Sequence, residues 1–178
     1  AITYLAHPNN PTAKLWDRAA IHQIIDAVAQ IGGLVVMDEA YQPFSSHSWI
    51  DEISAAPARH SHVLLMRTLS KFGLAGIRLG YMVGPAALVH EIDKVRPPYN
   101  ISALNAEATL FALEHADEYA RQAAELRSER ARLSAALVAL GITVFPSEAN
   151  MILVRVPDSK QCFEGMKARG VLVKHIAA

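Results

Sequence analysis

The sequence is poor in cysteine and has no long hydrophobic run. Cys162 is the single cysteine in 178 residues, which excludes an internal disulfide framework and a multi-cysteine metal site and fits a reducing compartment. No apolar run approaches the ~20 residues that a membrane-spanning helix needs, and no charged-then-apolar leader is present. These absences predict a cytoplasmic protein that does not enter a membrane.

The sequence also lacks an excess of charge of either sign. Its 17 basic side chains match 17 acidic ones, so there is no electrostatic argument for a nucleic-acid partner. The eight histidines are scattered. His60 and His62 would share one face of a strand but have no third ligand nearby, so no metal site is predicted. Cys162 is expected to be a small core residue of an amphipathic helix.

What the sequence does contain is enough apolar material for a core, since 52% of its residues are hydrophobic. The chain starts within a strand-like run, AITYLAHP, and stops just after another, GVLVKHIAA. We therefore expect an internal piece of a larger protein. Continuous apolar runs predict buried strands at residues 2–5, 34–37, 63–68 and 79–84, and helical spacing predicts helices from Asp17 to about Ile31 and from Pro85 to about Val95.

Alternating strands and helices with continuous apolar strands are typical of an α/β fold, a mostly parallel sheet with helices on both faces. Residues 43–60 read as a loop, because Pro43 and Pro57 interrupt a mixed polar stretch. In such sheets, ligands bind beyond the carboxyl ends of the strands. The polar residues that follow the strands are therefore the candidates for a site.

The second half differs in composition. Residues 103–140 are rich in Ala, Leu, Glu and Arg, which predicts one long helix, or two with a kink. Its interleaved acids favour a solvated face over an RNA-binding basic helix. Strands are predicted at 142–145, 151–156 and 171–174, and a helix at 159–169. We expect a large α/β unit in residues 1–100, a helical link in 101–140 and an incomplete small α+β unit in 141–178.

Three groups of polar residues follow the predicted strands: Asn10, Asp38 with Tyr41, and Lys71. Taken singly they read as a turn residue, a cap or structural ion pair, and a surface lysine. Taken together, at one edge of a sheet, they suit an aromatic aldehyde cofactor with a basic ring nitrogen. A lysine amine condenses with an aldehyde, a carboxylate keeps a pyridine nitrogen protonated, and an amide and a phenol can bind a ring oxygen. Hydroxyls at Thr68 and Ser70, with the guanidinium of Arg78, would suit a phosphate.

The segments HPNNPT, DEAY and SKFGLAGIRLGY resemble the three successive signatures of the fold-type I aminotransferases, which use pyridoxal 5'-phosphate. In their residues, the segments RTLSKFGLAGIRLGY, VVMDEAYQPF and FPSEANMILVRV are most similar to the histidinol-phosphate aminotransferase branch. The resemblance runs through essentially the whole chain. It implies that residues 1–100 are the C-terminal part of the large cofactor-binding domain.

The resemblance also implies a role for each matched residue. Lys71 would be the Schiff-base lysine and proton carrier, Asp38 the partner of the ring nitrogen, and Asn10 and Tyr41 the contacts to the 3-oxygen. Thr68, Ser70 and Arg78 would hold part of the phosphate. The reaction implied is transfer of an amino group between a small-molecule donor such as glutamate and a keto acceptor such as imidazole acetol phosphate, in histidine biosynthesis, by a homodimer.

Two residues depart from the family pattern, which usually has Gly where Ala13 stands and Asn where His7 stands. Because a Cβ opposes positive φ, we expect an ordinary backbone conformation at Ala13. Family members are about twice this length, so the chain alone is expected to bind the cofactor weakly and to be inactive. Another transaminase of aromatic or aliphatic amino acids, a decarboxylase of a phosphorylated amino acid, and a non-enzymatic regulatory module of the same fold stay open.

Overall fold

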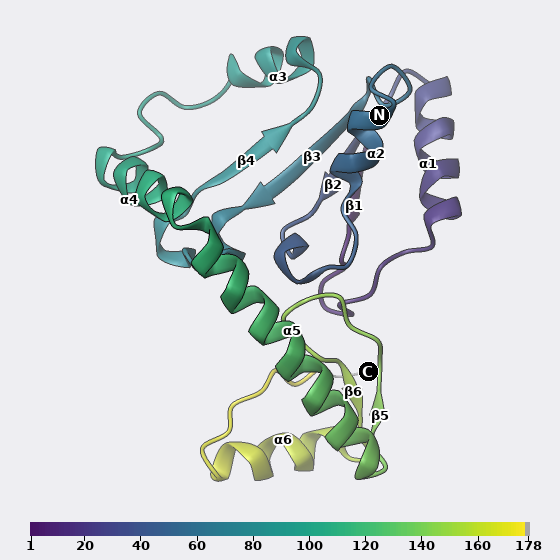
Figure 1. Cartoon of the computed structure of the whole chain (residues 1–178). Helices are drawn as coiled ribbons and strands as arrows, with labels where there is room; N and C mark the ends of the chain where they lie inside the picture. Colours follow the sequence, from purple (N-terminus) through teal and green to yellow (C-terminus); the bar gives the residue numbers. More distant parts are fainter. Residues whose placement is uncertain (177–178) are drawn as a thin grey trace.

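A four-stranded sheet forms the N-terminal part of the protein in the computed structural model, which describes residues 1–176 (Figure 1). Its order is β1 (Ile2–Ala6), β2 (Leu34–Asp38), β3 (Val63–Thr68) and β4 (Gly80–Val83). β1, β2 and β3 are parallel, and β4 is antiparallel to β3. The four predicted strands and the mostly parallel α/β sheet are thereby confirmed.

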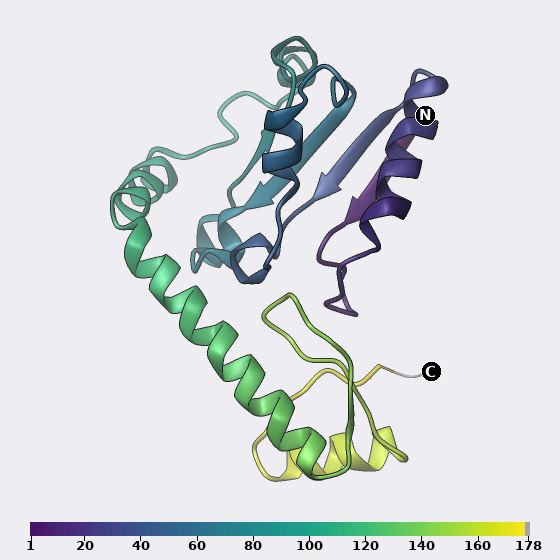
Figure 2. The same cartoon turned by 45° about the vertical axis from the view of Figure 1, so that its right-hand side comes forward.

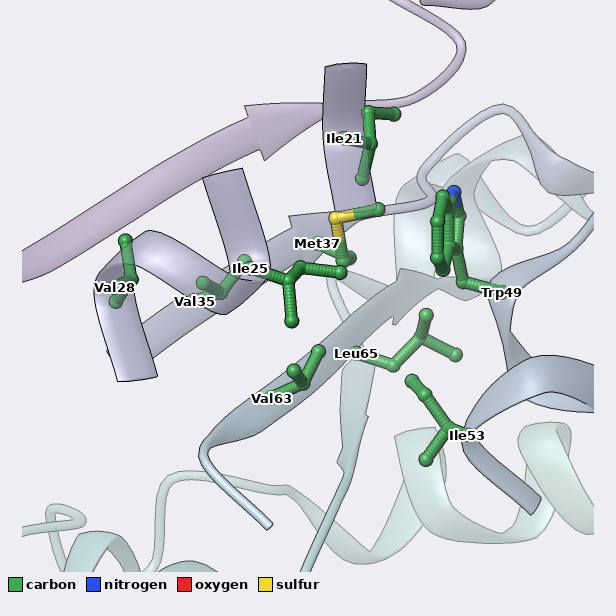
Figure 3. Packing of buried hydrophobic residues seen from close by; sticks show 9 residues of the cluster. All are labelled: Ile21, Ile25, Val28, Val35, Met37, Trp49, Ile53, Val63 and Leu65. Atoms are coloured by element: carbon green, nitrogen blue, oxygen red, sulfur yellow. The ribbon is translucent and has the colours of Figure 1, made fainter. Parts of the chain in front are cut away.

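Helices α1 (Arg18–Gln30) and α2 (Trp49–Ala55) cover one face of this sheet. Figure 3 shows the side chains that meet there. The cluster comprises Ile21, Ile25, Val28, Val35, Met37, Trp49, Ile53, Val63 and Leu65. The alternate residues of β2 and β3 supply this face because successive side chains of a strand point to opposite sides. The main hydrophobic core therefore lies between the sheet and these two helices.

The opposite face of the sheet is only partly covered by residues 1–176. Val36 and Leu64 are buried there, but Ile2, Tyr4 and Met66 are 59%, 68% and 36% exposed. The apolar runs predicted helices on both faces of the sheet. In the part of the chain that the structure describes, helices cover one face, and the other stays partly exposed.

The prediction that residues 43–60 form a loop is wrong, because they contain α2. Ser48 caps this helix by accepting a hydrogen bond from the backbone N–H of Ile50 at 3.1 Å. Two acids, Asp51 and Glu52, lie in the first turn, where they favour the positive end of the helix dipole. Burial of Trp49 and Ile53, four residues apart on one side of the helix, offsets the polar character of the rest.

Short 3-10 turns follow the strand ends: η1 (Gln42–Phe44) after β2, then η2 (Leu69–Lys71) and η3 (Ala75–Ile77) between β3 and β4. Helix α3 (Ala86–Asp93) begins directly after Pro85, as predicted. The turns matter for the site because η2 ends at Lys71 and η1 starts directly after Tyr41.

The predicted long helix is two helices, α4 (Ala103–Glu114) and α5 (Ala116–Ala139), separated at His115. In both Figure 1 and Figure 2, α5 runs from the sheet region to a C-terminal unit made of β5 (Thr143–Val144), β6 (Val154–Arg155) and α6 (Ser159–Ala168). None of the helices in residues 1–176 is long and apolar enough to span a membrane.

Several predictions for the C-terminal unit are corrected by the structure. The segments 142–145 and 151–156 pair over two residues each, and 171–174 is not a strand. An apolar run becomes a strand only where a partner offers its backbone groups, and residues 171–174 have no such partner among residues 1–176. Cys162 is exposed rather than a core residue, because α6 buries none of its side chains.

The histidine pair His60 and His62 lies in the turn before β3 and not in a strand. The Nδ1 atom of His60 contacts the carbonyl oxygen of Ala56 at 2.9 Å, and Nε2 of His62 contacts that of Ile25 at 3.0 Å. Both rings are therefore used in backbone contacts.

Candidate functional site

The carboxyl ends of β1, β2 and β3 meet at one edge of the sheet. The backbone N–H of His7 donates to the carbonyl oxygen of Asp38 at 2.8 Å, and the N–H of Glu39 donates to that of Met66 at 2.8 Å. The parallel ladders therefore continue one residue past the strands. This brings together the segments that carry the predicted residues.

Asp38 is the last residue of β2 and is half-buried. Its Oδ1 accepts a hydrogen bond from the backbone N–H of Ala40 at 2.9 Å. This bond turns the carboxylate along the chain toward the start of η1 and leaves Oδ2 for another partner. Asp38 therefore caps no helix, since the N-cap of η1 is Tyr41, and its hydrogen bond stabilises the turn that leads to η1.

Asn10, Tyr41 and Lys71 come together, although they are far apart in sequence. The side-chain N–H of Asn10 donates to the Tyr41 hydroxyl at 3.1 Å, and the Lys71 amine lies 5.2 Å from the centroid of the Tyr41 ring. The second contact is a cation–π arrangement. Tyr41 is buried, and its side chain lies between the Asn10 amide of the first loop and the Lys71 amine of η2.

The hydroxyl and guanidinium groups predicted for a phosphate also lie close together. Thr68 caps η2 by accepting from the N–H of Ser70 at 3.1 Å. The guanidinium of Arg78 lies 3.5 Å from the Ser70 hydroxyl and donates to the Ala75 carbonyl at 3.3 Å. Arg78 has φ of +57° and an exposed side chain. It is therefore available to an anion that approaches Ser70.

Ala13 has φ of +58°, so the prediction of an ordinary conformation there is wrong. Its backbone N–H donates to the carbonyl oxygen of Asn9 at 2.7 Å, and its own carbonyl oxygen accepts from the backbone N–H of Glu148 at 2.7 Å. The methyl group is fully buried in a small cluster. That cluster comprises Ala13, Tyr41, Phe44, Ala123 and Ala149. These contacts offset a strain of roughly 1 kcal/mol.

Residues of α5 and of the following loop reach the site from the C-terminal half, which the sequence pattern did not predict. Arg130 donates to the carbonyl oxygens of Phe44 at 3.2 Å and Ala149 at 2.7 Å. The Glu148 side chain accepts from the N–H of Ser46 at 2.7 Å. Charged residues on a long helix read as a solvated face, so nothing local distinguished Arg130 from its neighbours.

His7 is buried beside the strand ends, and neither of its ring nitrogens has a hydrogen-bond partner within residues 1–176. Burial, together with the nearby ring of His47 and against the opposing charge of Glu52, lowers the pKa of His7 to about 4. The Glu52 carboxylate is 2.8 Å from Arg18 and 3.0 Å from His22. It is 3.3 Å from Nε2 of His47, without the geometry of a hydrogen bond. His7 is thus neutral over the physiological range.

The sequence matches the family described as "Aminotransferase class I and II" over residues 2–178. This match includes every residue of the site. The chain belongs to this family. The structure also has the fold of this family. The histidinol-phosphate aminotransferase of Clostridium acetobutylicum superimposes with a TM-score of 0.83 at 22% identity, over 96% of this chain and 53% of that one.

Two further similarities concern named relatives of this chain. It is 71% identical over 178 residues to the histidinol-phosphate aminotransferase of Methylibium petroleiphilum, covering 99% of this chain and 47% of the relative. The Sinorhizobium meliloti histidinol-phosphate aminotransferase, solved in complex with pyridoxal-5'-phosphate, gives a TM-score of 0.78 at 24% identity, over 99% and 49% of the two chains. At that identity the second similarity shows the fold. The chain spans about half the length of the relatives it matches.

The polar groups at the sheet edge fit pyridoxal phosphate. Asp38 keeps one carboxylate oxygen free of the Ala40 contact. No carboxylate pairs with Lys71 among residues 1–176, and its amine is held against Tyr41. Arg78 offers an exposed guanidinium beside a hydroxyl. In the same residues no group of three or more His, Cys, Asp or Glu could hold a metal ion.

Proposed function

We propose that this chain is part of an enzyme that transfers an amino group with pyridoxal 5'-phosphate. One substrate pair is histidinol phosphate and imidazole acetol phosphate, and the other is glutamate and 2-oxoglutarate. In each pair the first molecule carries the amino group and the second is its keto form. The observation that carries the proposal is the approach of the Lys71 amine to within 5.2 Å of the Tyr41 ring, at the sheet edge that also bears Asp38. The names of the relatives support the substrate pair.

When bound, the cofactor supplies an aldehyde and an electron-accepting pyridinium ring. Lys71 would hold the group through that aldehyde, with release of one water, and its Nζ would move a proton while the amine is not bonded to the aldehyde carbon. Asp38 keeps a proton on the ring nitrogen through its free carboxylate oxygen, because a negative charge there favours the charged ring. The amide of Asn10 and the hydroxyl of Tyr41 bind the 3-oxygen; their mutual hydrogen bond of 3.1 Å orients both groups beforehand.

Thr68, Ser70 and Arg78 bind the phosphate in this proposal. A guanidinium presents two parallel N–H donors to a phosphate, which a lysine cannot do. The contact of 3.5 Å between Arg78 and Ser70 puts such a donor pair beside a hydroxyl. The αL conformation of Arg78 at the end of η3 directs its side chain back along that turn, toward Ala75.

We also propose that the full enzyme is a homodimer in the cytoplasm. Large apolar side chains of α4 are exposed, such as Leu104 at 82% and Phe111 at 61%, as expected for a surface that another chain or segment covers. The single cysteine supports a reducing compartment.

The substrate assignment is tested in the full-length protein. This is a protein of the relatives' length that contains these residues unchanged. We expect turnover of histidinol phosphate with 2-oxoglutarate to exceed that of phenylalanine, measured as glutamate formed. Higher kcat/KM with phenylalanine would replace the substrate assignment by that of an aromatic transaminase. No turnover with either amine, alongside a fused DNA-binding segment, would favour a regulatory module.

The role of Lys71 is tested by Lys71→Ala in the full-length protein. Loss of the amine should lower turnover by about a thousandfold or more while leaving part of the cofactor affinity. Lys94→Ala is the matched control, because Lys94 is exposed and its one salt bridge within residues 1–176 is with Glu91. Undiminished turnover of Lys71→Ala would refute the assignment.

Residues 1–178 alone are proposed to bind the cofactor weakly and to be inactive, because they hold about half of the relatives' length. Mixing this chain with pyridoxal phosphate should give only a weak visible absorption band. A strong band together with glutamate-dependent turnover would overturn this statement.

A further inference from the structure

A buried ion pair lies beside the site but contains none of the residues assigned to it. The Glu39 side chain is fully buried and that of Arg67 is 19% exposed. Both Nε and Nη2 of Arg67 donate to Oε2 of Glu39, at 3.1 and 2.9 Å. The Ser48 hydroxyl and the backbone N–H of Trp49 also donate to Glu39, the latter to Oε1 at 2.6 Å. Every oxygen of this carboxylate is therefore used.

The pair connects the ends of two strands one residue away from the site. Glu39 directly follows Asp38 at the end of β2, and Arg67 directly precedes Thr68 at the end of β3. Since side chains alternate along a strand, Glu39 and Arg67 point to the α2 side while Asp38 and Thr68 point to the other side. The pair can therefore set the separation of the two strand ends without touching a ligand.

Helix α2 and strand β4 are joined to the same network. Arg67 donates to the Ser48 hydroxyl at 2.7 Å, and Ser48 caps α2. Burial by itself lowers the pKa of Arg67, but the Tyr81 side chain, on its cross-strand partner in β4, and the hydrogen-bonded Glu39 carboxylate outweigh it and raise that pKa above the ordinary value. Arg67 is thus a permanent cation, and the network spans β2, β3, β4 and the start of α2.

Stability alone is a weak reason for such a pair. Desolvating two charges costs free energy that their attraction only roughly restores, and apolar residues of similar volume are often as stable. What an apolar pair lacks is the fixed geometry of a guanidinium that donates through two nitrogens to one carboxylate. A geometric role at the strand ends therefore explains the pair better than a contribution to stability.

We propose that Glu39 and Arg67 are positioning residues for the cofactor site, which fix the Asp38 carboxylate relative to Thr68, Ser70 and Lys71. This proposal rests on the function proposed above. The chain connection is direct, because Arg67 leads through Thr68 into η2, which ends at Lys71. A shift of the β3 end relative to β2 thus moves the amine away from the groups that bind the ring.

The test compares cofactor affinity with stability in the full-length protein. Glu39→Gln leaves a buried cation with a weaker partner, whereas the double variant Glu39→Gln with Arg67→Met removes both charges. We expect the double variant to regain much of the unfolding midpoint of the apoprotein, measured by circular dichroism in urea, because no buried charge is left unpaired. Its Kd for pyridoxal phosphate, measured by titration of the visible band, should stay at least about tenfold above that of the unchanged protein.

Asp26→Asn is the matched control, because Asp26 forms an exposed pair with Arg59 at 2.9 Å. It should change neither quantity. A double variant with restored stability and an unchanged Kd would overturn the proposal and leave the pair a purely structural element. If the double variant does not fold, Arg67→Lys replaces it, since lysine keeps the charge but not the two-nitrogen geometry. An unchanged Kd in that variant would overturn the proposal equally.

The proposed function itself fails in a different way. In that case the unchanged protein and Lys71→Ala would give the same visible spectrum with the cofactor. Failure of the positioning role alone leaves a spectrum that depends on Lys71 and a Kd that does not depend on Glu39 or Arg67. The two outcomes are therefore distinguishable in one set of titrations.

Discussion

The sheet region and the C-terminal unit are held together in different ways. In the sheet region, α1 buries Ile21, Ile25 and Val28 against two strands that are themselves buried. In the C-terminal part, the 24-residue α5 buries only Ala123 among its side chains, and α6 buries none. The first region has its own core, whereas the second is positioned by polar bridges to the first and by the small apolar cluster that Ala123 and Ala149 share with it. Substitutions should therefore act on the two regions with different strength.

The largest expected effect is that of removing the centre of the sheet-region core. Trp49→Ala should lower the free energy of unfolding by about 3–5 kcal/mol, because a fully buried aromatic side chain leaves a cavity. Leu133→Ala in α5, where the leucine is 47% exposed, should cost less than about 1 kcal/mol. Urea unfolding followed by circular dichroism measures both. Equal losses would contradict the contrast between the regions.

The second effect is a pH dependence confined to the sheet region. The unfolded chain protonates His7 as the pH falls through 6.5, but the folded chain does so only near pH 4. The part of the folding stability that depends on a neutral His7 is therefore fully present above pH 6.5. It is lost progressively as the pH falls from 6.5 to about 4. The loss between pH 7.5 and 4.5 should be on the order of 2 to 3 kcal/mol larger in the unchanged protein than in His7→Asn. Parallel curves for the two proteins would remove His7 as the cause.

The smallest effect concerns the bridge from α5. Arg130→Ala removes the donor that the carbonyl oxygens of the buried residues Phe44 and Ala149 share, and it should cost about 1–2 kcal/mol. The control is Arg132→Ala in the same helix, since Arg132 is exposed and its one salt bridge in the part of the chain that the structure describes is with Glu129 at 2.6 Å. It should cause no measurable change. If both variants unfold at the same urea concentration, the bridge does not hold the C-terminal unit in place.

Part of this fold is predictable from the sequence because it depends on local patterns. The apolar runs at 34–37 and 63–66 are continuous, so the two central strands follow from composition. Helix α2 was missed because Pro43 and Pro57 on either side of it, and the polar residues between them, suggest a loop. The cap at Ser48, followed by Asp51 and Glu52, is the local signal that could have revealed it.

Other features depend on partners that are distant in sequence. The run at 171–174 has the composition of a strand, but pairing cannot be deduced from composition. The positive φ of Ala13 is stabilised by the hydrogen bond from the backbone N–H of Glu148 to the Ala13 carbonyl oxygen and by packing of its methyl group. The conformational preference of alanine by itself does not predict these contacts. Asn10, Tyr41 and Lys71 were predicted to be neighbours and are so in the structure. Their roles toward a cofactor stay a prediction.

The Glu39–Arg67 pair was overlooked although Glu39 belongs to the motif that identified Asp38. Alternation with Val35 and Met37 puts Glu39 on the buried side of β2, and a charge at such a position requires a partner. The same alternation with Val63 and Leu65 applies to Arg67. Period-two alternation at the end of an apolar strand was therefore the available signal.

The length of α5 also gives it the properties of a lever. Its 24 residues span about 36 Å, so a tilt of about 5° around one end displaces the other end by about 3 Å. Arg127 and Arg130 sit near mid-length, where they hold the carbonyl oxygens of Pro43 and Phe44 in η1. A movement of the C-terminal unit thus arrives at η1, next to Tyr41, reduced to roughly half its amplitude. A large displacement at the far end becomes a fine adjustment beside the Lys71 amine.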